Sequence, residues 1–242
     1  MGVLFYRKQI ILNMMKKKLI YLCTFVFTIS LLSSCNEDEA TKDDLLGTWN
    51  IRSSGSMEII WESSENISIT EEISLPTSTV AELLVEYGNN QLSEELKSIT
   101  FRKDDKVEFT YFDDDLNGWN TDVFGEYKVK SRKDLIFRPD VDKLLEGMDV
   151  SATSLAGIKA LVATTGIPLK ITFIGPTAAE VRLSIETGTM KEMKVLFPIL
   201  AASITGNSAE DIMIKILLEK LPELIEKSDK IEVGFYFDKA LN

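Results

Sequence analysis

The sequence predicts a mainly β domain with inserted helices (α+β), in which an antiparallel up-and-down β-barrel has helices covering a mouth or one side. Apolar and polar residues alternate in about ten segments between residues 45 and 242, which is typical of strands with one buried face. Short polar turns join most of these segments. A meander of this length must close or stack to bury its apolar face and remove its edges, and a barrel does both.

The strand candidates follow one another closely along the chain. The first is expected to begin near Leu45, and two rows joined by a hairpin turn at 63–66 follow it: Met57, Ile59 and Trp61, then Ile67, Ile69, Ile73 and Leu75. Three further hairpins are predicted to pair 99–101 with 107–111, 123–129 with 135–137, and 169–173 with 181–185. The last strand is predicted at 231–237.

Three segments have the apolar spacing of helices instead. Residues 77–97 are predicted to be helical with an interruption at 88–90, and residues 140–165 follow the same pattern. Residues 190–228 are predicted to hold two helices. Ser208 with Asp211 suggests a capping box for the second, whose apolar stripe runs from Ile212 to Ile225, and Pro222 is expected to kink or restart it.

Charge and composition exclude several classes of function. The formal net charge of the chain is −11, and residues 1–34 carry +5, so the remainder carries −16 and would repel nucleic acid. The chain contains no histidine, the side chain most often used as a general base. No glycine-rich phosphate loop is present either. The sequence therefore predicts a non-enzymatic protein without a cofactor, and without nucleic acid as a partner.

The N-terminal segment, residues 1–34, has the form of a signal peptide. Lys16, Lys17 and Lys18 precede the apolar run 19–32, which is short for a membrane-spanning helix and suits the core of a signal sequence. Translation from Met14 or Met15 fits this pattern better than translation from Met1. The run ends in Leu-Ser-Ser-Cys at 32–35, which resembles the bacterial lipobox. That resemblance implies cleavage after Ser34 and lipidation of Cys35, the one cysteine left in the mature chain.

Residues 35–44 are acidic and are predicted to form a flexible tether between the lipid and a domain spanning 45–242. Acidic residues directly after the lipidated cysteine also resemble the surface-export signal of Bacteroidetes lipoproteins, although a tether without a sorting role explains them as well. The expected location is the outer membrane, with the domain facing either the periplasm or the outside.

Leu46-Gly47-Thr48-Trp49 resembles the Gly-x-Trp motif of lipocalins, in which the tryptophan closes the base of the barrel. The order of lipobox, acidic tether, Gly-Thr-Trp and strand meander is similar to that of lipocalin-like lipoproteins of Bacteroidetes, a family without an assigned function. The resemblance implies a lipocalin-like barrel with Gly47 and Trp49 at its first strand. Two departures are the three helical insertions and the lack of a matching arginine, for which Lys239 is the nearest basic candidate.

Two polar features of residues 113–119 suggest binding chemistry. Asp113, Asp115 and Asn117, followed by glycine, match the first half of a calcium loop, but its twelfth position is Phe124 rather than glutamate. A polar hairpin turn is the simpler interpretation. Trp119 follows directly, and an exposed tryptophan could stack on a sugar ring, with local packing as the alternative.

The predicted function is therefore that of a membrane-anchored lipoprotein that binds a small apolar ligand in or beside its barrel. The alternative is an interaction or accessory subunit that captures a glycan or a protein through its surface. The sequence does not indicate an oligomeric state.

The lipid anchor predicts the behaviour of Cys35→Ser. The variant should no longer fractionate with membranes, because it lacks the thiol that receives the lipid, while its domain should fold normally. Membrane fractionation followed by circular dichroism of the soluble protein checks both expectations. Membrane association that persists in the variant would show that the run 19–32 is retained as an anchor.

Overall fold

The computed structural model describes residues 42–64, 66–68, 74–113, 115–131, 133–145, 151–175, 178–203 and 209–240. The predicted signal peptide, Cys35 and the tether through residue 41 lie outside these ranges. So do the predicted strand residues Ile69 and Ile73 and the predicted helix cap Ser208.

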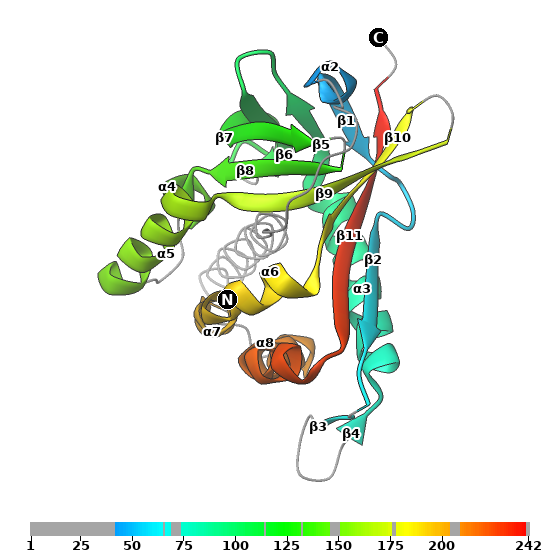
Figure 1. Ribbon diagram of the computed structural model, residues 1–242, viewed down its shortest axis with the longest axis vertical. Helices are drawn as coiled ribbons and strands as arrows, with labels where there is room; N and C mark the ends of the chain where they lie inside the picture. The colour runs from blue at the N-terminus through cyan, green and yellow to red at the C-terminus, as the bar shows by residue number, and fades with distance from the viewer. Residues whose placement is uncertain are drawn as a thin grey trace, which may run out of the picture.

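Eight antiparallel strands close into a lipocalin-like barrel, which confirms the predicted fold class (Figure 1). From β5 onward each strand pairs with the next along the chain, and β1 closes the barrel by pairing with both β5 and β11. The eight strands are β1 (Gly47–Ile51), β5 (Leu96–Phe101), β6 (Lys106–Asp113), β7 (Gly118–Ser131), β8 (Asp134–Pro139), β9 (Ile167–Ile174), β10 (Glu180–Ile185) and β11 (Lys230–Lys239). The three hairpins predicted at 99–111, 123–137 and 169–185 are β5–β6, β7–β8 and β9–β10.

A ninth strand, β2 (Met57–Glu62), lengthens the sheet beyond the barrel. β1 and β2 follow one another along β11, since Ile51 pairs with Phe237 and Met57 pairs with Phe235. The predicted hairpin between β2 and residues 67–75 is wrong: β3 (Ile67–Ser68) pairs with β4 (Ser74–Leu75) instead. β2 pairs with β11 instead, so its apolar row lies beside the equally apolar row of that strand. A local turn at 63–66 could not bring these two strands together.

Aromatic side chains fill the interior of the barrel. Phe109 stacks on Phe124 with ring centroids 5.0 Å apart. Phe101 meets Tyr127 edge-on at 5.0 Å, and the ring of the fully buried Trp49 lies 6.2 Å from that of Phe173. Ring pairs of this kind add to the free energy gained by burying their area. Aromatic side chains therefore occupy a large part of the barrel core.

A β-bulge in β7 changes which residue enters this core. Val107 pairs with Gly125 and Glu108 with Val123, so Phe124 is an extra residue without an opposite partner. Phe124 is buried, whereas Val123, which the sequence pattern placed on the inner face, is only half-buried. Period-two counting fails at a bulge because two residues oppose one.

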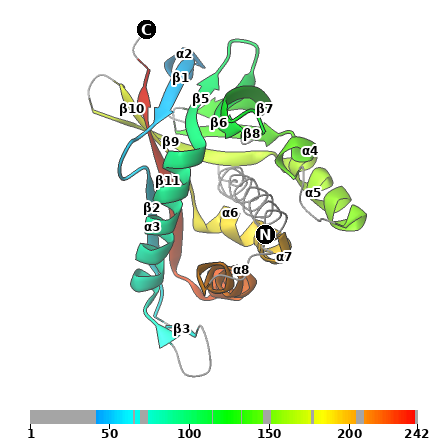
Figure 2. The ribbon, with the colours of Figure 1, turned by 180° about the vertical axis from the view of Figure 1, so that it is seen from behind.

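Helix α3 (Thr77–Glu95) runs without the interruption predicted at 88–90. Gly88 is buried, and a Cβ atom there would lie 2.3 Å from the Met57 sulfur. The Asn89 side chain accepts hydrogen bonds from the Met57 backbone N–H and the Ser56 hydroxyl. Gly88 and Asn89 therefore fasten the helix to β2 instead of ending it. Figure 2 shows α3 running along β2.

The remaining helices are short except for two. They are α2 (Lys42–Leu45), α4 (Val141–Leu144), α5 (Ala152–Thr165), α6 (Thr187–Glu192), the 3-10 helix η1 (Lys194–Leu196), α7 (Phe197–Ser203) and α8 (Ala209–Lys227). The last residues of the expected tether thus form α2, and 190–228 holds more than the two helices predicted. Pro222 lies inside α8 and does not restart it. Among the described helices, none combines the length and the apolar character needed to cross a membrane.

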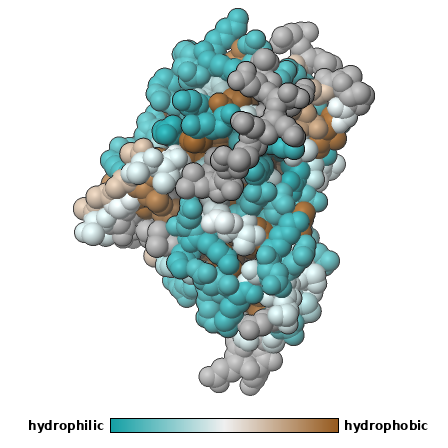
Figure 3. All heavy atoms as spheres, viewed as in Figure 1, coloured by the Kyte–Doolittle hydropathy of each residue, from teal (hydrophilic) through white to brown (hydrophobic). Residues whose placement is uncertain are grey.

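The face of the molecule in Figure 3 is largely hydrophilic, with pale and apolar atoms on the projecting helix α5 and smaller apolar patches elsewhere. Most of the exposed residues of α5 are small, including Ala156, Gly157 and Ala160. Figures 1 and 2 place α6, α7 and α8 together beside the end of β11 that lies outside the barrel.

The bulge in β7 predicts a large effect of Gly125→Ala. A Cβ atom at 125 would lie 2.3 Å from the Arg138 carbonyl oxygen. Because this oxygen belongs to the backbone, no side-chain rotation can relieve the clash. We expect the free energy of unfolding to fall by about 2 kcal/mol or more. Gly118→Ala in the same strand is the control, because its Cβ atom would meet nothing closer than 3.8 Å. Equal urea midpoints for the two variants would contradict this role of Gly125.

Candidate ligand-binding site

An apolar cavity lies beside the barrel, between the part of the sheet that extends past it and the helices that cover this part. β2 and β11 form one wall, α3 a second, and α6, α7 and α8 the third. The lining residues are Met57, Ile59, Trp61, Leu84, Tyr87, Gly88, Met190, Phe197, Ile214, Leu218, Leu221, Ile231, Val233 and Phe235.

The cavity has a volume of about 100 Å³, and the described residues that line it carry no charged side chain. Among them, only Trp61 and Tyr87 bring polar side-chain atoms, and the Trp61 indole N–H donates to the Ser228 hydroxyl at 2.7 Å. A polar ligand placed here would lose its hydrogen bonds to water without replacement, which costs several kcal/mol. The cavity therefore favours apolar ligands.

Ordinary strand and helix geometry directs these side chains inward. Alternate residues of β2 and of β11 face the cavity, as the sequence pattern predicted for Met57, Ile59 and Trp61. On α8 the lining residues are Ile214, Leu218 and Leu221, which share one helix face. The predicted stripe included Ile212, but this residue is 49% exposed, so the buried face is rotated away from it. The sequence did not show that these three faces meet.

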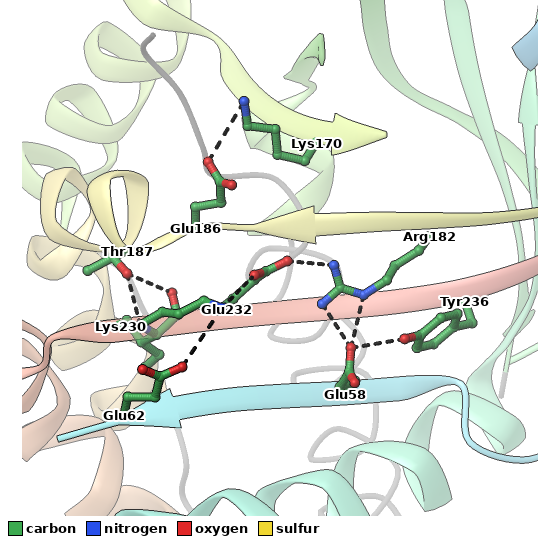
Figure 4. Close-up of polar contacts among 10 residues, drawn as sticks. Glu58, Glu62, Lys170, Arg182, Glu186, Thr187, Lys230, Glu232 and Tyr236 are labelled. Carbon is green, nitrogen blue, oxygen red and sulfur yellow. Dashed lines mark hydrogen bonds and ion pairs between the residues drawn. The ribbon is translucent and has the colours of Figure 1, made fainter. Parts of the chain in front are cut away.

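The outer face of the same sheet extension carries a charged group of residues, the Arg182 cluster, formed by Arg182, Glu58, Glu232 and Tyr236 (Figure 4). The guanidinium contacts a Glu232 oxygen at 2.5 Å and a Glu58 oxygen at 2.9 Å, and the Tyr236 hydroxyl donates to Glu58 at 2.9 Å. These contacts join β10, β11 and β2. A Cβ atom at Gly234 would lie 2.5 Å from the Arg182 Nε, so glycine lets the guanidinium lie flat across β11.

The Arg182 and Glu232 side chains are only 12% and 15% exposed. Burial alone would raise the pKa of Glu232, but hydrogen bonds from Arg182 and Ser184 and the charges of Arg182 and Lys230 bring it below its ordinary value. Both carboxylates of the cluster are engaged by the guanidinium, so the arrangement holds strands β2, β10 and β11 together. Sequence analysis missed the cluster; its one signal was Gly234 inside an otherwise apolar and aromatic strand.

The two motif residues Gly47 and Trp49 lie at the start of β1. The Trp49 indole N–H donates to the Leu45 carbonyl at 2.7 Å, and the Lys239 ammonium lies 5.0 Å from the centre of its ring. Lys239, the nearest basic candidate in the sequence for the arginine that packs on the lipocalin tryptophan, thus lies over the Trp49 ring. These residues close the barrel end next to α2 and take no part in the cavity.

The predicted calcium-loop residues lie at the tip of the β6–β7 hairpin. One Asp113 oxygen accepts the backbone N–H groups of Asp115 at 2.9 Å and Leu116 at 3.3 Å, and Asn117 has a left-handed φ of 48°. Turn chemistry explains these residues without an ion. Within the described ranges, no three acidic or thiol side chains form a metal-binding group. Calcium binding stays a prediction.

Trp119 lies beside this tip and is 46% exposed. Its ring packs edge-on against Phe112 at 5.6 Å, with the Lys97 ammonium 5.8 Å from its centre. The site therefore combines local packing with an accessible ring, and glycan stacking at Trp119 also stays a prediction.

Comparisons of this chain with protein-family models, with curated proteins and with solved structures find no match. The class of protein is therefore set by the molecule itself: a lipocalin-like barrel with an apolar cavity beside it.

The Arg182 cluster predicts a pH-dependent effect of Glu232→Gln. Since the folded pKa of Glu232 is lowered, its stabilising contribution is complete above the pKa of an unfolded glutamate, about 4.3, and is lost as the pH falls through the folded value. We expect a loss of about 2–3 kcal/mol at pH 7 that shrinks below about pH 4. Denaturant unfolding across this range measures it. Glu223→Gln is the control: it removes an exposed ion pair with Lys227 and should reduce the free energy of unfolding far less. A loss of stability in Glu232→Gln that does not change with pH would contradict the lowered pKa of Glu232.

Proposed function

We propose that this protein is a non-enzymatic binding lipoprotein of the outer membrane, anchored through Cys35, whose cavity beside the barrel takes a small apolar ligand. The observation that carries the proposal is the cavity's lining, in which described residues from six separate elements meet without a charged side chain among them. The ring pairs Phe101–Tyr127 and Phe109–Phe124 occupy the barrel interior, which favours a site beside the barrel.

The size of the cavity limits the ligand class. Drug-sized ligands occupy pockets of about 300–1,000 Å³, whereas an engineered apolar cavity of about 150 Å³ binds benzene. A cavity of about 100 Å³ therefore suits a single ring or the end of an alkyl chain.

The proposed anchor fits this ligand class. Apolar molecules partition into membranes, so a domain tethered at the membrane surface by a lipid on Cys35 would meet them at a raised local concentration. The tether outside the described structure is short, because only six residues separate Cys35 from Lys42.

Benzene is the probe for this cavity. Saturating benzene should raise the unfolding temperature of residues 36–242, because a ligand that binds only the folded state stabilises it. Leu218→Phe places extra atoms in the cavity and should remove most of the shift, whereas Leu116→Phe, the same change at the exposed β6–β7 tip, should preserve it. Benzoate is the charged counterpart of the probe and should give no shift.

An equal benzene shift in both variants would place the binding elsewhere, and no shift in the unmodified domain would refute the proposal. Native mass spectrometry before and after organic extraction gives an independent measurement. We expect a bound small molecule that extraction removes and that Leu218→Phe fails to retain.

A further inference from the structure

Strand β2 is an end strand of the nine-stranded sheet, and in the described part of the chain it pairs only with β11. The Tyr236 backbone N–H donates to the Ser56 carbonyl at 2.8 Å, which fixes the alternation: residues 56, 58, 60 and 62 direct their backbone groups toward β11. Met57, Ile59 and Trp61 therefore direct theirs toward the free edge. This edge faces α3.

One position of the edge is already occupied by a side chain. The Asn89 Oδ1 atom accepts the Met57 backbone N–H at 2.8 Å, as the carbonyl of a neighbouring strand would. Asn89 belongs to α3, so the helix completes the edge at Met57 through this contact. Ile59 and Trp61 lie farther along the edge, away from Asn89.

A groove of about 470 Å³ runs along this seam between β2 and α3, and we call it the β2–α3 groove. Its helix side is formed by Ser78, Ala81, Glu82 and Val85, which share one face of α3. Ser78 and Ala81 have small side chains, so they leave space between α3 and the β2 residues Ile59 and Trp61. The groove is open to the outside and is more polar than the cavity, because Glu58 and Tyr236 also line it.

We propose that the β2–α3 groove binds an extended, basic peptide segment of a partner protein, which adds to the sheet as a strand beside β2. The edge backbone groups of Ile59 and Trp61 provide hydrogen bonds that any extended peptide can complete. An edge strand beside a helix is a recurring setting for this mode of recognition, and the helix face supplies contacts for alternate side chains.

Charge defines the partner. Glu82 is exposed on the helix side, and Glu86 lies exposed nearby on the same helix, so α3 supplies the charge that a partner would meet. On the strand side, Glu58 is already paired with Arg182 and Glu62 with Lys230. The whole chain carries a net charge of −11. Lysine or arginine at alternate positions of the incoming segment would therefore be attracted, and an acidic segment would be repelled.

The probe is a blocked hexapeptide of alternating lysine and valine, titrated into residues 36–242 with amide NMR as the readout. We expect binding accompanied by shifts of the Ile59 and Trp61 amide signals and by slower hydrogen exchange at Ile59. The same peptide with its alternate backbone nitrogens methylated should bind at least tenfold more weakly, because it cannot complete the strand pairing. A glutamate–valine peptide should not bind.

Two variants locate the site. Ala81→Phe fills the groove from α3 and should weaken the lysine–valine peptide at least tenfold, whereas Ala152→Phe on the exposed side of α5 should leave binding unchanged. Glu82→Lys changes an exposed charge without altering packing, so it separates binding from folding should Ala81→Phe fail to fold. It should weaken the basic peptide and admit the acidic one.

The absence of binding by the lysine–valine peptide would overturn the proposal. Binding that survives backbone methylation or Glu82→Lys would also overturn it, since attraction to acidic surface in general would then explain the result. The benzene response of the cavity is independent of these outcomes, so the two proposals fail separately.

Discussion

The length of the last strand is the constraint on which the rest of the structure depends. β11 has ten residues and pairs with β10 along one edge and with β1 and then β2 along the other. Its final residues close the barrel through β1, while its first residues continue past the barrel with β2 beside them. Its inner face is apolar from Ile231 to Phe237, so Phe237 enters the barrel core while Ile231 and Val233 line the cavity. The cavity exists because β11 is longer than barrel closure requires.

The sheet extension lacks the closure that holds barrel strands in register. Its inner face is stabilised by burying apolar area against helices. On its outer face, the ion pairs and hydrogen bonds of the Arg182 cluster connect neighbouring strands. A buried ion pair is weak evidence for stability in itself, because desolvation offsets much of the attraction. Its geometry is specific, however: Arg182 reaches Glu58 only because Gly234 leaves the intervening strand flat. The cluster therefore fixes which strands lie side by side, at a place where apolar contacts would tolerate slippage.

Sequence reasoning succeeded where the partners were local. The β5–β6 hairpin was predictable because Phe101 and Val107 are separated by a short polar turn. It failed where a residue distant in the sequence decided the outcome. No residue near Met57 in the sequence indicates that Met57 pairs with Phe235. Likewise, the local sequence does not show whether Gly88 breaks a helix or packs against another residue. The apolar faces of the cavity were each visible as periodic patterns. Their meeting depends on the pairing of β2 with β11, which one sequence without relatives does not reveal.

A β-strand has two faces and two edges, and the strands that close the barrel commit both edges to pairing and one face to the core. β2 is different because, within the described residues, only one of its edges is paired with another strand. Its inward side chains line the cavity, its outward Glu58 joins the Arg182 cluster, and its second edge borders the β2–α3 groove. The proposed ligand and the proposed peptide thus approach the same strand through different atoms, side chains in one case and backbone in the other. That separation follows from the pleat of the strand, and it allows each kind of binding to be removed without removing the other.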